Sequence, residues 1–284
     1  MIMNQNSFLE QNISHLPALF TLIKLGYKYL SPIETDKLRA EKTSNILLDD
    51  ILRRQLKIIN SDYRISSSRT TYISDANIEN AIKELKNIPL NEGYITSCEY
   101  VYNAIMLGKS FDQMVDGEKK SITVQYIDWK NIENNVFHIT EEFNVLRNNS
   151  NDHYRPDLVL FINGIPICII ECKRPDKENS IITAINQHIR NQKEDGIRSL
   201  YVYSQILISL SGNEAKFATN GTTENFWAIW KEDLKNEDIS NEFNKNLKEF
   251  KNKKINEEII NNIFSFRKKY QKENFIKHLE EDVE

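Results

Sequence analysis

Two acids and one base stand close together near the middle of the chain. Asp157 precedes one apolar run, and Glu171 and Lys173 close the next. Two carboxylates held a few ångströms apart are costly to bury without a cation, and they suit Mg²⁺, a hard ion that takes oxygen ligands. Such an ion can activate a water for attack on a phosphate, while the lysine orients that water or offsets the phosphate charge. The spacing therefore indicates metal-dependent hydrolysis, with an ordinary exposed Glu-Lys pair at a strand end as the alternative.

Two apolar runs must position these side chains. Within residues 155–175 the runs are rich in Val, Leu and Ile and flank Asn163 and Gly164, which predicts a β-hairpin with a tight turn. Successive side chains point to opposite faces of a strand, so Glu171 and Lys173 share one face. The opposite face takes Cys168, Ile170 and Cys172.

The two acids can meet only if this hairpin departs from the ideal form. A two-residue loop places Asp157 opposite Ile170 rather than opposite Glu171. A three-residue loop or a β-bulge restores the pairing of the acids, and bulges are common beside active sites. Pro166 has no N–H to donate and favours a break in the ladder. We therefore predict a non-ideal hairpin.

The remaining periodicity predicts helices around a sheet. Helices are expected within 8–30 and at 42–59, 74–88, 97–107, 180–193 and 223–232, and strands at 121–129, 136–145, 200–210 and 215–219. From residue 236 onward Asn, Lys and Glu dominate, and sparse apolar residues at intervals of three and four predict amphipathic helices. The order of three strands, a helix and a strand predicts an α/β protein with a mixed central sheet.

The composition is that of an ordinary soluble protein. The 284 residues are 27% charged with a formal net charge of -4, so a DNA-binding surface would have to be a local patch. Cys98, Cys168 and Cys172 are too few for a disulfide framework and lack the partners of a zinc site, which favours a reducing compartment. The chain shows no signal-peptide pattern and no apolar run near the roughly 20 residues of a membrane span. We expect a cytoplasmic protein without membrane association.

The acids and the base resemble a known nuclease motif. Asp157, Glu171 and Lys173 match PD-(D/E)xK. The longer sequence around the motif resembles the N-terminal nuclease domain of type I restriction enzyme R subunits. Its two segments are Arg-Pro-Asp-Leu-Val-Leu-Phe-Ile-Asn-Gly-Ile-Pro, from Arg155, and Ile-Glu-Cys-Lys-Arg-Pro, from Ile170. The resemblance implies a restriction-endonuclease-like core of αβββαβ topology. We expect this domain at 1–235, with a helical tail or linker at 236–284.

The resemblance also implies a metal site. Asp157, Glu171 and the backbone carbonyl of Cys172 would bind Mg²⁺. In the family a glutamate precedes the first helix, and Glu10 matches it by register to the Leu-Pro-Ala-Leu that begins at Leu16. Glu10 is therefore expected as a further ligand or a water-mediated contact.

Two further catalytic roles follow from the same likeness. Lys173 would orient or polarise the attacking water. The helix after Glu-x-Lys carries a Gln-x-x-x-Tyr element in the family, which implies a supporting role for Gln187. Asn191 stands at the tyrosine position, so this chain departs from the pattern there.

The resemblance implies partners that these residues do not supply. The family acts on double-stranded DNA with modification and specificity subunits, and its motor domains hydrolyse ATP. Gly108-Lys109-Ser110 looks like the tail of a phosphate-binding loop, but Asn103 stands where that loop needs glycine, so we expect a helix C-cap at Gly108. We expect a fragment, a truncated gene or one piece of a split subunit. The alternatives are a catalytically silent module that docks on the other subunits and a non-nuclease α/β enzyme.

Overall fold

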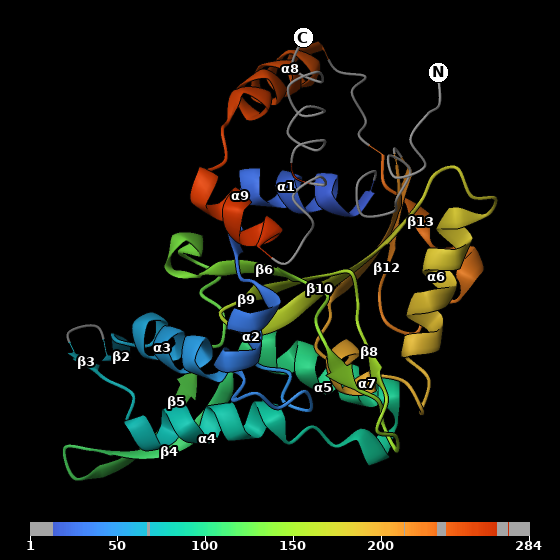
Figure 1. Cartoon of the computed structure of the whole chain (residues 1–284). Helices are drawn as coiled ribbons and strands as arrows, with labels where there is room; N and C mark the ends of the chain where they lie inside the picture. Colours follow the sequence, from blue (N-terminus) through green and yellow to red (C-terminus); the bar gives the residue numbers. More distant parts are fainter. Residues whose placement is uncertain (1–13, 67–68, 213, 232–236, 266–271, 273–284) are drawn as a thin grey trace, which may run out of the picture.

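A seven-stranded mixed sheet organises the computed structural model, which describes residues 14–66, 69–212, 214–231, 237–265 and 272 (Figure 1). Across the sheet the strands are β1 (Lys28–Tyr29), β6 (Phe137–Glu141), β9 (Leu158–Ile162), β10 (Ile165–Lys173), β11 (Ile206–Ser211), β12 (Glu214–Ala218) and β13 (Ala228–Ile229). β6, β9 and β10 form an antiparallel meander, whereas β10 and β11 run parallel and are joined through α6 (Ser180–Asn191). The predicted α/β class with a mixed sheet is confirmed.

Helices cover both faces of this sheet. α1 (Leu16–Lys24) and α9 (Glu257–Phe264) lie over one face. The other helices are α2 (Pro32–Leu38), α3 (Asp49–Ile59), α4 (Asp75–Lys86), α5 (Tyr94–Leu107), α7 (Arg198–Tyr201) and α8 (Glu237–Asn252). Small antiparallel hairpins pair β2 (Tyr63–Ser66) with β3 (Arg69–Thr71), β4 (Lys109–Val115) with β5 (Glu118–Val124), and β7 (Val145–Leu146) with β8 (His153–Tyr154). No helix in the described part of the chain has both the length and the apolar character to cross a membrane.

Alternation along the central strands divides the core in two. On one face Leu158 and Leu160 pack with α1 and α9, and Cys168, Ile170 and Cys172 join them as predicted. On the other face Val159 and Phe161 pack with residues of α3, α4 and α5. The period of two along each strand therefore supplies both cores from the same hairpin.

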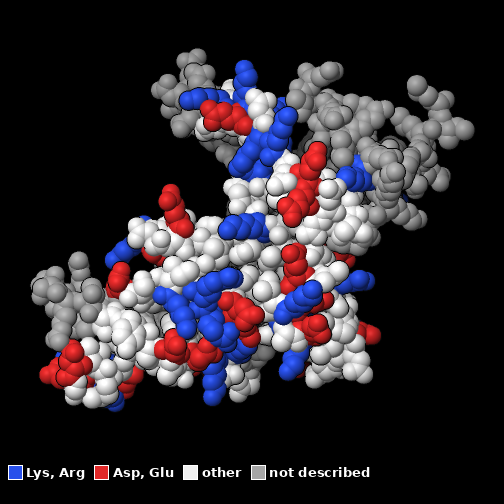
Figure 2. All heavy atoms as spheres, turned by 60° about the vertical axis from the view of Figure 1, so that its left-hand side comes forward, with Lys and Arg blue, Asp and Glu red and all other residues white. Residues whose placement is uncertain are grey.

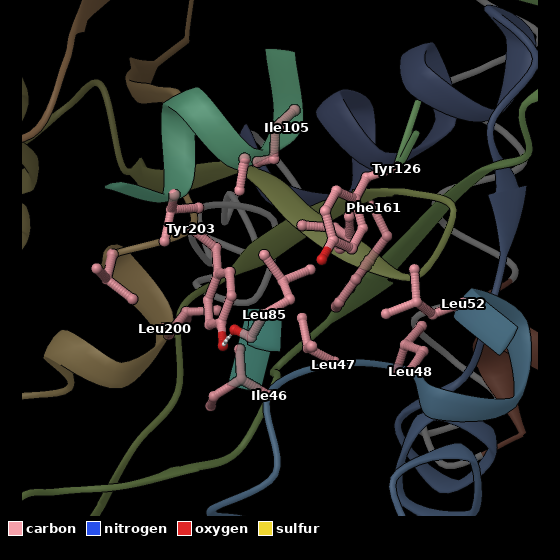
Figure 3. Close-up of a cluster of buried hydrophobic side chains, with 14 of the residues drawn as sticks. Ile46, Leu47, Leu48, Leu52, Leu85, Ile105, Tyr126, Phe161, Leu200 and Tyr203 are labelled. Atoms are coloured by element: carbon pink, nitrogen blue, oxygen red, sulfur yellow. Dashed lines mark hydrogen bonds between the residues drawn. The ribbon is translucent and has the colours of Figure 1, made fainter. Parts of the chain in front are cut away.

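Figure 3 shows part of the second core, where Tyr126 and Phe161 lie near Leu52. Both aromatic rings are fully buried, and burying such a side chain stabilises the fold by about 1.5–3 kcal/mol. The hydroxyl of Tyr203 donates to the carbonyl oxygen of Leu85 at 2.9 Å, so this polar group is satisfied inside the core.

The Asn163-Gly164 turn is buried rather than exposed. Its φ values of 53° and 85° are those of a two-residue type I′ turn. The Asn163 side chain accepts from the N–H of Val136 at 2.9 Å and donates to the carbonyl oxygen of Tyr126 at 2.9 Å. The N–H of Leu48 donates to the carbonyl oxygen of Gly164 at 2.9 Å. The turn thus anchors the hairpin to segments far away in the sequence.

The hairpin carries the predicted irregularity. Its register shifts between Pro166 and Cys168, so two residues of β10 oppose one of β9. Beyond the shift Ile170 pairs with Leu158, and the next position along the same register brings Glu171 opposite Asp157. The prediction of a non-ideal hairpin is confirmed.

The predicted strand at 200–210 is wrong in its first half. Residues Arg198–Tyr201 form the short helix α7, and β11 begins only at Ile206. The N–H groups of Tyr201 and Val202 donate to carbonyl oxygens within this turn. A short apolar run does not by itself distinguish a helical turn from a strand.

The predicted helix at 223–232 is also wrong. A 3₁₀ turn at Glu224–Phe226 leads into β13, which pairs with β12. The N–H of Trp230 donates to the carbonyl oxygen of Ala215 at 2.9 Å. The strand β12 therefore provides hydrogen-bond partners for the backbone of this segment, which in a helix would have bonded to itself.

Other predicted elements are present with shifted bounds. The helix expected at 42–59 begins at Asp49, and α2 was not predicted. The strand expected at 121–129 is β5, whose partner β4 was missed, and the strand expected at 136–145 ends at Glu141. The expected helix C-cap at Gly108 is confirmed, with φ of 75°.

The tail helices pack on the sheet domain. Ile263 and Phe264 of α9 belong to the core that contains α1. The Nζ of Lys253 donates to the carbonyl oxygen of Lys24 at 2.6 Å. The boundary between 235 and 236 stays a prediction, because residues 232–236 lie outside the described part of the chain.

Candidate active site

The predicted acids and base converge at one end of the central hairpin. The Nζ of Lys173 lies 3.8 Å from Oδ2 of Asp157, and both side chains are mostly buried. The same oxygen of Asp157 accepts the N–H of Cys172 at 2.6 Å. Glu171 is fully buried beside them. The bulge in the hairpin is what brings Asp157 opposite Glu171, since the unshifted register would have placed Ile170 there.

Glu171 lies in a site that disfavours its charge. Burial raises its pKa well above the usual value, and the neighbouring Asp157 carboxylate raises it further. Lys173 acts in the opposite direction. Two carboxylates beside one ammonium group leave an excess of acceptor oxygens, which is the donor set that Mg²⁺ prefers. The residues present therefore fit a divalent cation.

The helix α6 presents two amides to Glu171. The Nε2 of Gln187 donates to Oε2 of Glu171 at 2.6 Å, so the predicted Gln187 lies where it can hold this carboxylate. The Nδ2 of Asn191, one turn further on, is 3.5 Å from Oε1 of Glu171 and 3.3 Å from the hydroxyl of Tyr201. Asn191 thus contacts the site despite departing from the family pattern, and Tyr201 is a neighbour that the sequence did not reveal.

A second group of possible ligands shares Asp157. One ligand atom each from His15, Glu142 and Asp157 lie within 4.8 Å of one another. The Nε2 of His15 is 3.3 Å from Oε2 of Glu141, whose other oxygen accepts the hydroxyl of Tyr29 at 2.7 Å. Burial raises the pKa of Glu142, and the nearby His15 is the main influence that opposes this rise.

Sequence reasoning missed this second group. Its one local signal was a pair of adjacent acids, Glu141 and Glu142, at the end of a predicted strand. His15 lies just before α1, more than a hundred residues away. The predicted ligand Glu10 lies outside the described residues. The carbonyl oxygen of Cys172, also a predicted ligand, accepts from Nζ of Lys173 at 2.9 Å.

Comparison with known proteins places the chain in a family. The family model described as the N terminus of type I restriction enzyme R proteins (HSDR_N) matches residues 7–226. Two relatives from Methanocaldococcus jannaschii bear provisional names as endonuclease subunits of the type I restriction enzymes MjaVIIIP and MjaIXP. The first is 35% identical over 77% of this chain and 20% of the relative, and the second is 28% identical over 81% and 21%.

A third relative comes from another organism. The type I restriction enzyme HindI endonuclease subunit of Haemophilus influenzae is 23% identical over 84% of this chain and 22% of the relative. The chain spans about a fifth of the length of these relatives. The matched region contains the central hairpin, α6 and every described residue of both ligand groups. The chain therefore belongs to the family of type I restriction enzyme R protein N termini.

Proposed function

We propose that this chain is the nuclease part of a type I restriction enzyme R subunit and that it hydrolyses phosphodiester bonds of DNA with Mg²⁺. The observation that carries the proposal is the convergence of Asp157, Glu171 and Lys173 through the bulged hairpin. The succession of α1, the meander of β6, β9 and β10, then α6 and the parallel strand β11 supports a restriction-endonuclease-like core. Membership of the R protein family supports the reaction class.

Each residue has a distinct role in this proposal. Asp157 and Glu171 bind the ion, and Gln187 holds Glu171 through its 2.6 Å hydrogen bond. A bound Mg²⁺ supplies an activated water and stabilises charge on the phosphate. Lys173, held near Asp157 and the Cys172 carbonyl, orients the attacking water and offsets the charge that develops on the phosphate.

The substrate and the partners extend the proposal beyond this chain. Double-stranded DNA that lacks protective modification is the substrate, and modification and specificity subunits are the partners. ATP-driven translocation belongs to parts of the R subunit other than these residues. Figure 2 shows basic and acidic side chains intermixed on one face of the molecule, so neither positive nor negative charge predominates on that face. This distribution is consistent with a domain that receives its DNA through partners rather than by strong attraction of its own.

Cleavage of a DNA duplex by the purified chain, with Mg²⁺ added, tests the proposal. Asp157→Asn removes a carboxylate ligand and Lys173→Met removes the ammonium group. Each is expected to lower the cleavage rate at least about 100-fold, since such groups act on the transition state. Asp176→Asn is the matched control, because Asp176 pairs with Arg174 on the nearby surface.

Two further measurements make the result decisive. Far-ultraviolet circular dichroism of each variant checks that the fold is retained. Calorimetric titration with Mg²⁺ compares the wild type with Glu171→Ala, which is expected to bind the ion more weakly. Cleavage by Asp157→Asn at the wild-type rate would show that the nuclease assignment is wrong. Equal Mg²⁺ binding by the wild type and Glu171→Ala would remove Glu171 from the metal site.

A further inference from the structure

Asn191 is a buried polar residue of α6 whose side-chain amide can face only one way. It is 1% exposed and lies one helical turn beyond Gln187. The Nε and Nη2 of Arg190 donate to its Oδ1 at 3.2 and 2.9 Å. A guanidinium group has donors and no acceptor, so the oxygen of the amide must face Arg190. The NH₂ group of Asn191 is therefore directed toward Tyr201 and Glu171.

Tyr201 fixes the same amide from the other side. Its hydroxyl is fully buried, 3.3 Å from Nδ2 of Asn191 and 2.9 Å from Nδ1 of His188. The other ring nitrogen of His188 lies 3.0 Å from the carbonyl oxygen of Ile208, an acceptor, so that nitrogen carries the proton and Nδ1 accepts. The hydroxyl proton of Tyr201 is therefore donated to His188, and the hydroxyl oxygen accepts from Asn191.

The direction of these hydrogen bonds decides which group meets Glu171. The NH₂ group of Asn191 has two hydrogens, one for the Tyr201 oxygen and one for Oε1 of Glu171 at 3.5 Å. The Nε2 of Gln187 donates to Oε2 of Glu171 at 2.6 Å. Both oxygens of this fully buried carboxylate thus face amide donors. An amide turned the other way would face it with an oxygen, which is costly in a buried place.

We propose that Tyr201 and His188 are positioning residues for the nuclease reaction and that they act on Glu171 through Asn191. This inference rests on the proposed nuclease function, because Glu171 belongs to that site. The hydrogen bonds run without a break from the backbone of β11 to the carboxylate, so they tie Glu171 to the sheet as well as to α6. A group held in one orientation needs no rearrangement during the reaction, which lowers the barrier.

Tyr201→Phe in the full chain tests the proposal, and Tyr203→Phe is the matched control. Tyr203 is also buried, and its hydroxyl donates to the carbonyl oxygen of Leu85 in α4 at 2.9 Å. Each substitution removes one buried hydroxyl, so both should shift urea unfolding by a similar amount. Only Tyr201→Phe is expected to lower kcat for Mg²⁺-dependent DNA cleavage, at least about fivefold, while KM for DNA is unchanged.

A double-mutant cycle with Asn191→Leu checks that the hydroxyl acts through the amide. Asn191→Leu removes the amide at similar volume and is expected to lower kcat at least about tenfold. In that background Tyr201→Phe should lower kcat no further, because the residue through which it acts is already absent. Wild-type kcat in Tyr201→Phe, or full additivity of the two substitutions, would overturn the proposal. If Asn191→Leu does not fold, the comparison of Tyr201→Phe with Tyr203→Phe decides.

A measurement on Glu171 itself separates this inference from the nuclease proposal. Its side-chain carboxyl carbon, observed by ¹³C NMR and assigned by its absence from Glu171→Gln, should shift in Tyr201→Phe and stay unchanged in Tyr203→Phe. An unchanged resonance in Tyr201→Phe, with a wild type that cleaves DNA, overturns the positioning role and leaves the nuclease proposal standing. Absence of cleavage by the wild type would instead overturn the nuclease proposal and, with it, the role given to Tyr201.

Discussion

Among single residues, His188 links α6 to the sheet. Its Nε2 lies 3.0 Å from the carbonyl oxygen of Ile208, which can only accept, so this nitrogen carries the proton. Its Nδ1, 2.9 Å from the hydroxyl of Tyr201, therefore accepts. Burial lowers the pKa of His188 to about 3, and the charge of Lys173 contributes to the lowering. The neutral imidazole thus bridges α6 and β11.

The lowered pKa of His188 predicts a loss of stability in acid. The unfolded chain protonates this histidine below about 6.5, whereas the folded chain does so only near 3. The stabilisation is therefore complete above 6.5 and is lost as the pH falls toward 3. Between pH 7 and pH 5 this amounts to about 2 kcal/mol of unfolding free energy. Urea unfolding at both pH values should show a loss about 2 kcal/mol smaller in His188→Gln than in the wild type.

His153 provides the comparison for this experiment. Its side chain is exposed on β8 and bonds only to Thr43 among the contacts described for it. His153→Gln should therefore lose as much stability as the wild type between the two pH values. An equal loss in His188→Gln would contradict a buried neutral histidine.

Among the elements, the central hairpin has its geometry fixed at both ends, by its turn and by its bulge. Its turn requires positive φ at two successive residues, which Asn-Gly supplies. Its open end requires a register shift, which the bulge between Pro166 and Cys168 supplies. The turn also lies against the start of α3, so Gly164 is needed for space as well as for conformation. A Cβ at Gly164 would lie 2.7 Å from the backbone oxygen of Leu48.

Alanine at two turn glycines separates these requirements. Gly117 has φ of 83°, and a Cβ added there would meet nothing within 4 Å, so Gly117→Ala carries the conformational penalty alone, about 1 kcal/mol. Gly164, at φ of 85°, adds the clash with Leu48, so Gly164→Ala should destabilise by about 1–3 kcal/mol more. Urea unfolding of both variants measures the difference. Equal destabilisation by the two substitutions would mean that α3 shifts to accommodate the added Cβ at no cost in free energy.

In the molecule as a whole, the C-terminal helix α9 covers part of one face of the sheet. α9 packs beside α1 over the strands that carry the first core, as Figure 1 shows. The Nδ2 of Asn262 donates to Oε2 of Glu34 at 3.4 Å, which adds a contact between α9 and α2. α1 in turn begins at the residues that border the candidate site. The tail therefore supports the segment that carries His15.

Two phenylalanines test this support. Phe264 of α9 is 6% exposed within the core, whereas Phe226 is 80% exposed. Phe264→Ala should lower the unfolding free energy by about 3 kcal/mol, because it leaves a cavity in the core that α9 shares with α1. Phe226→Ala should change it by less than about 0.5 kcal/mol. Thermal unfolding followed by circular dichroism compares the two, and similar melting temperatures would show that α9 does not contribute to the core.

Local sequence patterns were enough to predict the hairpin, its irregularity and the shared face of Glu171 and Lys173. Turn chemistry, the period of two along a strand and the parity of the spacing between Asp157 and Glu171 are local constraints, so they can be read without the fold. The same locality allowed most helices to be predicted, although not the ends of α3 or the partner strand β4.

The surroundings of these residues could be known only from the folded chain. The full burial of Glu171, the burial of the Asn163-Gly164 turn and the strand in place of a helix at 228–229 depend on what packs against each segment. The approach of His15 to Glu142 joins segments more than a hundred residues apart. Neither residue has a neighbour in sequence that predicts the other, because such contacts arise from how α1 and the end of β6 are placed on one sheet.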